Sequence, residues 1–313
     1  MKKVLIIKLG YTETLENALS FTASLGDVLR TTVILHFFKG DEVSWLVDEK
    51  AAGLLADNPF ISRVLTYDAG SFARLTQEKF DVVINLEKLP EICLLAESIE
   101  CVTYLGFRIG HGGGAADEAT RRLTELALNT DKRRQSRECW QKILADALGE
   151  VWDGQPYVLG YRPTTPVRYD VGFNWATGSK WTNKAWNEEN WRALDTLLKD
   201  TCSVSWQRGL SSISEYVDWI NSCRLLVTSD SLGLHIALAL GKRVVALFGP
   251  TSPHEIYFYG LGSYILPETP YTCIPCLSPY CSQPRQCMEF ISPERVKERV
   301  IYELKNTAPS GTV

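Results

Sequence analysis

Asp27 is the first side chain in this sequence whose type and position suit acid–base chemistry. It ends the run Ser24-Leu25-Gly26-Asp27, between an apolar stretch that predicts a strand and a periodic stretch that predicts a helix. A carboxylate in such a place can accept the proton of an attacking hydroxyl. Ser24 or Asp27 can equally cap the helix and complement its dipole, so both interpretations stay open.

A polar segment at residues 174–186 has the composition of a loop that holds phosphate groups. It follows an expected strand and contains Thr177, Lys180 and Lys184 among small residues. Small residues let a ligand approach the backbone, and cations with hydroxyls suit a diphosphate. An exposed loop with solvated lysines has the same composition, so the sequence supports a phosphate site and a plain surface loop about equally.

A second strand-to-helix junction, at residues 228–235, places Asp230, Ser231 and His235 near a helix N-terminus. Helix N-termini bind anions through their free amides, and a histidine in the first turn can reach a phosphate. The alternative is a capped helix in which Asp230 or Ser231 holds the amides and His235 belongs to the core.

Four cysteines gather in a Pro-rich irregular stretch, at Cys273, Cys276, Cys281 and Cys287. The first pair has the spacing of a metal knuckle, and tetrahedral thiolate ligation suits zinc or iron. The later spacings match no standard zinc ribbon. The sequence therefore favours a structural zinc or iron site, with four reduced thiols as the alternative.

These side chains need a scaffold, and short apolar strands alternate with amphipathic helices along most of the chain. Expected strands are 4–9, 43–47, 64–67, 82–86, 102–107, 169–173, 204–206, 225–228 and 244–248. Expected helices are 27–38, 49–56, 72–78, 91–98, 138–148, 188–199, 213–221, 232–240 and 293–304. The alternation predicts an α/β protein with parallel sheets covered on both faces.

A stretch rich in Gly and Pro, residues 154–166, interrupts this alternation. It predicts two Rossmann-like domains, 1–160 and 161–313, that face one cleft. Open parallel sheets bind ligands beyond the carboxyl ends of their strands. We therefore expect Asp27 on one side of the cleft and the segments 174–186 and 228–235 on the other.

The composition narrows the function classes. A formal net charge of -4 over 313 residues excludes a strongly basic nucleic-acid binder. The N-terminal apolar run ends at Lys8, well short of the roughly 7–15 apolar residues of a signal peptide, and no stretch approaches the ~20 of a membrane helix. Together with nine cysteines, this favours a reducing, cytoplasmic location.

A glycine-rich stretch at residues 110–114 superficially suggests a nucleotide loop. It lacks the glycine spacing of the dinucleotide fingerprint, and no acidic residue is placed to bind a ribose. A flexible loop is the favoured interpretation, and a nicotinamide-dependent oxidoreductase is disfavoured.

Several blocks, taken in order, resemble glycosyltransferase family 9, the lipopolysaccharide heptosyltransferases. They start with the opening strand and run to about residue 295, and each is weak alone. The blocks are 24–32, 45–47, 58–64, 184–191, 229–235 and 246–251.

This resemblance implies a GT-B fold and an inverting transfer of a heptose from a nucleotide-diphosphate donor, ADP-heptose in this family. The acceptor it implies is a saccharide, free or lipid-linked, of lipopolysaccharide or another surface glycan. Asp27 matches the family's general base, and Lys184, Asp230, Ser231 and His235 match donor-binding positions. No catalytic cofactor is implied, and a lipid-linked acceptor places the enzyme peripherally at the inner face of the membrane.

The four-cysteine stretch is similar to the iron-binding cysteine finger of autotransporter heptosyltransferases. Three departures from the family pattern stand out. Residues 11–23 are an insertion before Asp27, Leu232 replaces a glycine, and the Gly-rich segment usual after strand 204–206 is missing. Two alternatives follow: a GT-B transferase for a different nucleotide sugar, and a catalytically silent GT-B scaffold that binds nucleotide sugar or organises an assembly. The sequence predicts no oligomeric state.

Overall fold

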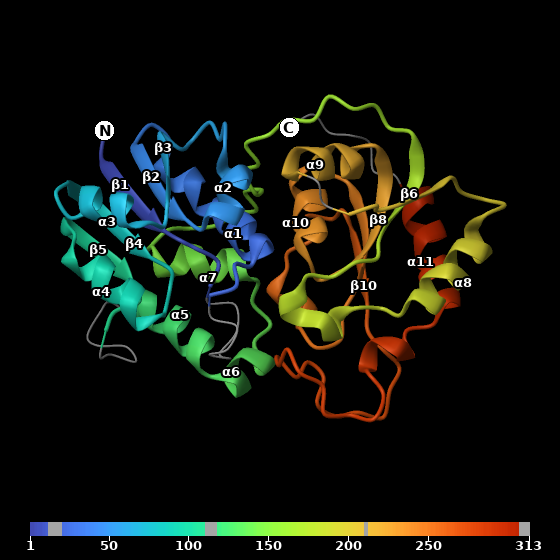
Figure 1. The fold of residues 1–313 in the computed structure, drawn as a ribbon. Helices are drawn as coiled ribbons and strands as arrows, with labels where there is room; N and C mark the ends of the chain where they lie inside the picture. The colour runs from blue at the N-terminus through green and yellow to red at the C-terminus, as the bar shows by residue number, and fades with distance from the viewer. Residues whose placement is uncertain (12–20, 110–117, 210–211, 307–313) are drawn as a thin grey trace. The chain divides into compact units, whose positions relative to one another are not determined.

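The computed structural model describes residues 1–11, 21–109, 118–209 and 212–306. The chain divides into two compact units (Figure 1). The first unit contains residues 1–162 together with His254–Tyr257, and the second contains the remaining residues from Pro163 onward. The segment 254–257 is therefore a late part of the chain that groups with the first unit.

The first unit is built on a parallel sheet of five strands within the described residues, in the order β3-β2-β1-β4-β5. Its strands are β1 Lys3–Ile7, β2 Glu42–Val47, β3 Arg63–Thr66, β4 Lys79–Asn85 and β5 Glu100–Gly106. Its helices are α1 Leu25–Thr31, η2 Thr32–Phe38, α2 Glu49–Leu55, α3 Ala69–Leu75, α4 Pro90–Ser98, α5 Glu118–Leu128, α6 Thr130–Gln135 and α7 Trp140–Ala147. The strand order reverses between β1 and β4, where such sheets hold their ligands.

Apolar side chains of α3 and α4 form one core with β1, β2 and β4, including Leu5, Leu46, Val83 and Ile92. The helices α1, α2 and α7 form another packed group. The sheet is thus a buried parallel sheet whose strands read as continuous apolar runs.

The helix predicted at 27–38 is shorter than expected. It begins at Leu25 as α1, and from Thr32 it continues as the 3-10 helix η2. The run of β-branched residues from Thr31 to Ile34 restricts side-chain rotamers in an α-helix, which explains the change of helix type.

The second unit repeats the plan with a parallel sheet in the order β10-β9-β8-β6-β7 across the described residues. Its strands are β6 Tyr169–Asn174, β7 Val204–Trp206, β8 Cys223–Ser229, β9 Arg243–Leu247 and β10 Gly262–Ile265. Its helices are η3 Ser179–Lys184, α8 Glu188–Leu198, α9 Ile213–Asn221, α10 Leu232–Ala239, η5 Cys287–Phe290 and α11 Pro293–Lys305. Here the order reverses between β6 and β8.

Helices α8 and α11 pack on one face of this sheet, around Phe173, Trp191 and Val300. Helices α9 and α10 contact each other and β8. Two separate parallel sheets confirm the predicted α/β class of two Rossmann-like halves. No helix in the described ranges is both long and apolar enough to cross a bilayer.

Candidate active site

Asp27 lies in the first turn of α1, near the carboxyl end of β1 and so beside the point where the strand order reverses. Ser24 occupies the N-cap position, but its side chain makes no capping bond within the described residues. The Asp27 carboxylate faces two cations instead of the helix amides. The geometry therefore disfavours the capping interpretation of this segment.

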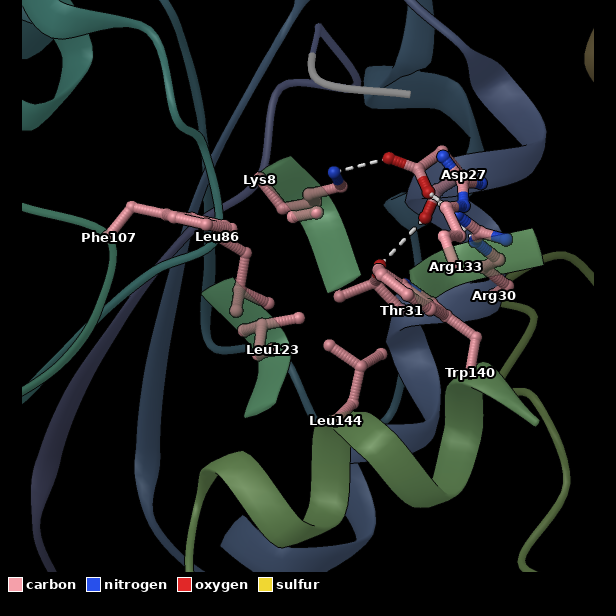
Figure 2. Close-up of a pocket in the computed structure, with 11 residues that line it drawn as sticks. Lys8, Asp27, Arg30, Thr31, Leu86, Phe107, Leu123, Arg133, Trp140 and Leu144 are labelled. Atoms are coloured by element: carbon pink, nitrogen blue, oxygen red, sulfur yellow. Dashed lines mark hydrogen bonds and ion pairs between the residues drawn. The ribbon is translucent and has the colours of Figure 1, made fainter. Parts of the chain in front are cut away.

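Both carboxylate oxygens of Asp27 are engaged (Figure 2). Lys8 Nζ forms an ion pair with Oδ2. Arg30 Nε donates a 2.7 Å hydrogen bond to Oδ1, and Arg30 Nη2 lies 2.5 Å from the same oxygen. The side chain of Asp27 is only 4% exposed. Burial alone would raise the pKa of Asp27, but the charges of Lys8 and Arg30 hold it well below its usual range. Asp27 is therefore ionised near neutral pH and is a weak base.

Glu87 fixes the other side of Lys8. It follows β4 and is fully buried, and its Oε1 lies 3.6 Å from Lys8 Nζ. The same oxygen accepts backbone N–H bonds from Leu9 and Gly10 at 2.7 Å and from Tyr11 at 3.3 Å. Burial would lower the pKa of Lys8, yet the two carboxylates, Asp27 and Glu87, raise it. Lys8 therefore stays protonated between them.

Two arginines and a tryptophan close the pocket around this cluster (Figure 2). The guanidinium groups of Arg30 and Arg133 lie 5.1 and 5.7 Å from the centre of the Trp140 ring. Arg133 also donates two hydrogen bonds to the Glu255 carboxylate, at 2.6 and 2.8 Å. Arg30 Nη1 lies 3.9 Å from that carboxylate. Apolar side chains such as Leu123 complete the wall, and the cavity volume is about 20 Å³, room for roughly one water.

In the second unit, Asn174 joins the elements that meet beside the reversal point of the sheet. Its amide donates to Thr228 Oγ1 at 2.7 Å and to Ser231 Oγ at 2.9 Å. Its carbonyl accepts a 2.7 Å bond from the Tyr216 hydroxyl. Ser231 holds the N-cap position of α10 without a capping bond from its side chain in the described structure. Asn174 thus ties β6, β8 and α9 to the start of α10.

Lys184 and Asp230 form a buried ion pair next to this junction. Lys184 Nζ lies 3.0 Å from Asp230 Oδ2 and 4.6 Å from the centre of the Trp181 ring. His235 Nε2 lies 4.0 Å from the other carboxylate oxygen. Burial would raise the pKa of Asp230, but the charges of Lys184 and His235 lower it well below its usual range. The structure brings three of the predicted donor-binding side chains together.

Ser231 adjoins this group in the chain, and the other two predicted residues lie in the segment just before Lys184. Lys180 is buried in η3, and Thr177 is half-buried in the loop that precedes η3. We call the set of Lys184, Asp230, Ser231 and His235 the donor cluster.

Leu232 stands where the family pattern has glycine, and the residue after it, Gly233, packs closely against its neighbours. A Cβ on Gly233 would lie 2.5 Å from the Tyr216 hydroxyl and closer still to Asn174 Nδ2. Only glycine lets α10 approach Asn174 this closely.

The four cysteines of the predicted metal site are free thiols, as are the other five, all of which lie in described segments. Burial, followed by the charges of the other three thiols, raises the pKa of Cys287 to about 11. Within the described ranges, however, no three His, Cys, Asp or Glu side chains are arranged to hold one metal ion. A metal site here stays a prediction.

Two features of the sequence analysis fall partly or wholly outside the described residues. These are the glycine-rich stretch 110–114 and most of the insertion, residues 12–20.

Sequence reasoning missed Glu87, Arg133, Glu255 and Tyr216. Glu87 had a usable signal, because an acidic residue directly after an apolar strand lies at the ligand-binding edge of a parallel sheet. Arg133 and Glu255 meet across 122 positions of sequence, and a single sequence carries no sign of such a pair.

Comparisons with known proteins agree with this architecture. Residues 209–285 match the model of glycosyltransferase family 9 (heptosyltransferase). The lipopolysaccharide heptosyltransferase 1 of Pseudomonas aeruginosa is 23% identical, over 92% of this chain and 91% of that protein.

Two solved structures share the fold. The E. coli ADP-heptose lps heptosyltransferase II has a TM-score of 0.65 at 15% identity, covering 97% of this chain and 99% of that one. The iron-containing dodecameric glycosyltransferase TibC of enterotoxigenic E. coli has a TM-score of 0.58 at 15% identity, covering 98% of this chain and 76% of that one. The predicted GT-B fold class is confirmed.

Proposed function

We propose that the chain is a glycosyltransferase of family 9 and that it moves a heptose from ADP-heptose to a saccharide of lipopolysaccharide or a related surface glycan. The buried Lys8–Asp27–Arg30 cluster beside the reversal point of the first sheet carries the proposal. A carboxylate kept ionised at such a place suits the acceptance of a hydroxyl proton.

The proposed reaction is a single displacement that inverts the anomeric carbon. The acceptor hydroxyl forms a bond to that carbon while the bond to the diphosphate oxygen breaks, and its electron pair leaves with the nucleotide. Asp27 takes the hydroxyl proton. Because Lys8 and Arg30 make Asp27 a weak base, it accepts the proton late, once attack has made the hydroxyl oxygen strongly acidic.

The donor cluster is the proposed site of the nucleotide diphosphate. Lys184 is a compact counter-charge for phosphate oxygens, and the first-turn amides of α10 offer further donors. Asp230 neutralises Lys184 in the absence of ligand. Fixed donors of this kind stabilise the charge that develops on a leaving diphosphate.

The place of the enzyme in the cell is part of the proposal. Nine free thiols support a reducing compartment, and we place the enzyme at the inner face of the membrane, where it would meet a lipid-linked acceptor. A structural zinc or iron held by Cys273, Cys276, Cys281 and Cys287 belongs to the same proposal, with the iron-containing TibC as its support.

Asp27→Asn tests the base assignment. Transfer of heptose from ADP-heptose to a heptose-deficient core oligosaccharide, followed by mass spectrometry, should fall roughly 10²–10⁴-fold. ADP affinity, measured by calorimetry, should persist. Because Lys8 and Arg30 lose a buried partner, the variant is also expected to unfold at a lower temperature, so both assays are run well below it. Transfer within a few-fold of the parent rate would show that Asp27 is not the base.

Lys184→Ala tests the donor cluster and should weaken ADP binding. It also leaves Asp230 without its ion-pair partner, so a lower melting temperature is expected as well. Lys199, exposed at the end of α8, supplies the matched control, and Lys199→Ala should bind ADP as the parent does. Equal ADP affinity in Lys184→Ala and the control would remove Lys184 from the donor site.

A further inference from the structure

A large cavity lies in the second unit, where strand β7 ends and helix α9 begins. Its volume is about 720 Å³, within the roughly 300–1,000 Å³ that small-molecule sites occupy. The side chains that line it include Trp206, Gln207, Tyr216 and Trp219. The rings of Tyr216 and Trp219 stack 6.0 Å apart, with an angle of 4° between their planes. The cavity therefore combines aromatic rings with the amide of Gln207.

Tyr216 connects this cavity to the donor cluster. It lines the cavity, and its hydroxyl donates a 2.7 Å hydrogen bond to the side-chain carbonyl of Asn174. Asn174 in turn donates a 2.9 Å hydrogen bond to Oγ of Ser231, a member of the donor cluster. Two hydrogen bonds in series therefore link the cavity wall to the start of α10. A ligand whose diphosphate lies on the donor cluster has this cavity within reach of its remaining part.

Gln207 holds a buried hydrogen-bond acceptor that the protein leaves unused. The residue is 6% exposed, and its side-chain Oε1 has no hydrogen-bond partner in the part of the chain that the structure describes. Its backbone is fixed, because its N–H donates to Phe173 at 3.1 Å and its carbonyl accepts a 2.9 Å bond from Trp175 Nε1. An unpaired buried acceptor is destabilising. Its presence in the wall of a cavity therefore points to a hydrogen-bond donor that a ligand supplies.

The place of Gln207 in the sheet indicates which part of the ligand that is. In dinucleotide-binding sheets the diphosphate lies beside the reversal of strand order, and a side chain at the end of a neighbouring strand hydrogen-bonds the ribose. The reversal in this unit is between β6 and β8, and β7 lies directly beside β6. Gln207 follows β7 immediately. It therefore occupies the position from which such sheets bind a ribose.

We propose that Gln207 accepts a hydrogen bond from a ribose hydroxyl of the donor nucleotide, whose nucleoside lies in the cavity lined by β7 and α9. The hydroxyl satisfies the buried oxygen of Gln207, and the aromatic rings supply apolar contact area for the nucleoside. A nucleotide without that hydroxyl leaves Oε1 unpaired, so the site selects ribonucleotides. The inference rests on the proposed donor site and adds to it a residue that determines specificity.

The experiment is calorimetric titration of the full-length protein with ADP, 2′-deoxy-ADP and 3′-deoxy-ADP. We expect the parent to bind ADP about 3–10-fold more tightly than at least one deoxy analogue, which corresponds to the net contribution of one hydrogen bond. Inosine diphosphate keeps the ribose but lacks the amino group of adenine, so it reports separately on a contact to the base.

Three variants assign the preference to one side chain. Gln207→Met nearly preserves the length of the side chain but removes the acceptor, so it should bind ADP and the deoxy analogues equally. Its melting temperature without ligand should not fall, because the unpaired buried oxygen is gone; a purely structural role would lower it. Gln207→Glu keeps an acceptor and should keep the preference. Gln77→Met, at an exposed glutamine of the first unit, is the matched control and should behave as the parent.

Equal affinity of the parent for ADP and both deoxy analogues would overturn the inference, and so would a preference that Gln207→Met retains in full. If Gln207→Met instead loses discrimination between ADP and inosine diphosphate, Gln207 contacts the base and the ribose assignment is wrong. A parent that binds no ADP at all would contradict the donor site of the proposed function. A parent that binds ADP without discrimination would contradict only this inference, so the two failures are distinguishable.

Discussion

Lys8→Met is the variant that most directly tests the electrostatics of the Asp27 cluster. Methionine nearly matches the length of the lysine stem but leaves Asp27 and Glu87 without the cation between them. Arg30 remains as the other partner of Asp27. Removal of one member of a buried ionic group typically costs about 3–5 kcal/mol, and we expect a loss of that order in the free energy of unfolding at pH 7.

The pH dependence of this loss distinguishes charge from packing. In the parent, the pKa of Asp27 is depressed, so its stabilising contribution is present above the unfolded value of about 3.9 and is lost only below that. Loss of an opposite charge at contact distance raises a carboxyl pKa by about 1–3 units. The variant's Asp27 should then take up its proton at a higher pH than the Asp27 of the parent does, so the gap in stability between parent and variant should narrow as the pH falls.

The assay is urea unfolding followed by circular dichroism at several pH values. Lys2→Met removes the same charge from an exposed position one residue before β1, and it should cost well under 1 kcal/mol at every pH. A loss in Lys8→Met that stays constant over the whole acidic range in which both proteins are folded would refute the electrostatic explanation and leave only a packing defect.

Two further variants test individual contacts. Gly233→Ala should destabilise the protein by about 1–3 kcal/mol through overpacking, because the added Cβ has no room beside Asn174 and Tyr216. Thermal melting measures this loss, and a melting temperature equal to the parent's would contradict the close packing. Arg133→Lys loses the pair of hydrogen bonds to the Glu255 carboxylate and should lower the free energy of unfolding by about 1–3 kcal/mol. A negligible loss would show that a single ammonium holds Glu255 as well as the guanidinium does.

Much of the fold follows from the sequence because the buried strands are continuous apolar runs. Runs such as the one in β1 are recognisable without any long-range information. Strand β10 was missed, since Gly262–Ile265 is short and carries no such run. Helix α6 was missed because Thr130–Gln135 buries no residue and so has no apolar face to signal it.

The sequence predicted those residues of the candidate site that combine a reactive side chain with a place after an expected strand. Asp27 and Asp230 follow expected strands, so the carboxyl-end rule of parallel sheets finds them. The cations that determine the charge state of Asp27 were not predicted, although the i,i+3 spacing of Arg30 was visible. Glu255 reaches this cluster from a late segment of the chain, and only the three-dimensional structure reveals that.

The backbone amides of Leu9, Gly10 and Tyr11 after β1 have a consequence for where phosphate can bind. Successive amides of this kind form a concave anion site, and in many Rossmann-like domains the first loop receives the phosphates of a nucleotide. Here the carboxylate of Glu87 already fills that position. An incoming phosphate would have to displace a fully buried internal anion, so the first unit is closed to nucleotide at its first loop. This agrees with the proposal that the second unit binds the donor and the first unit binds the acceptor.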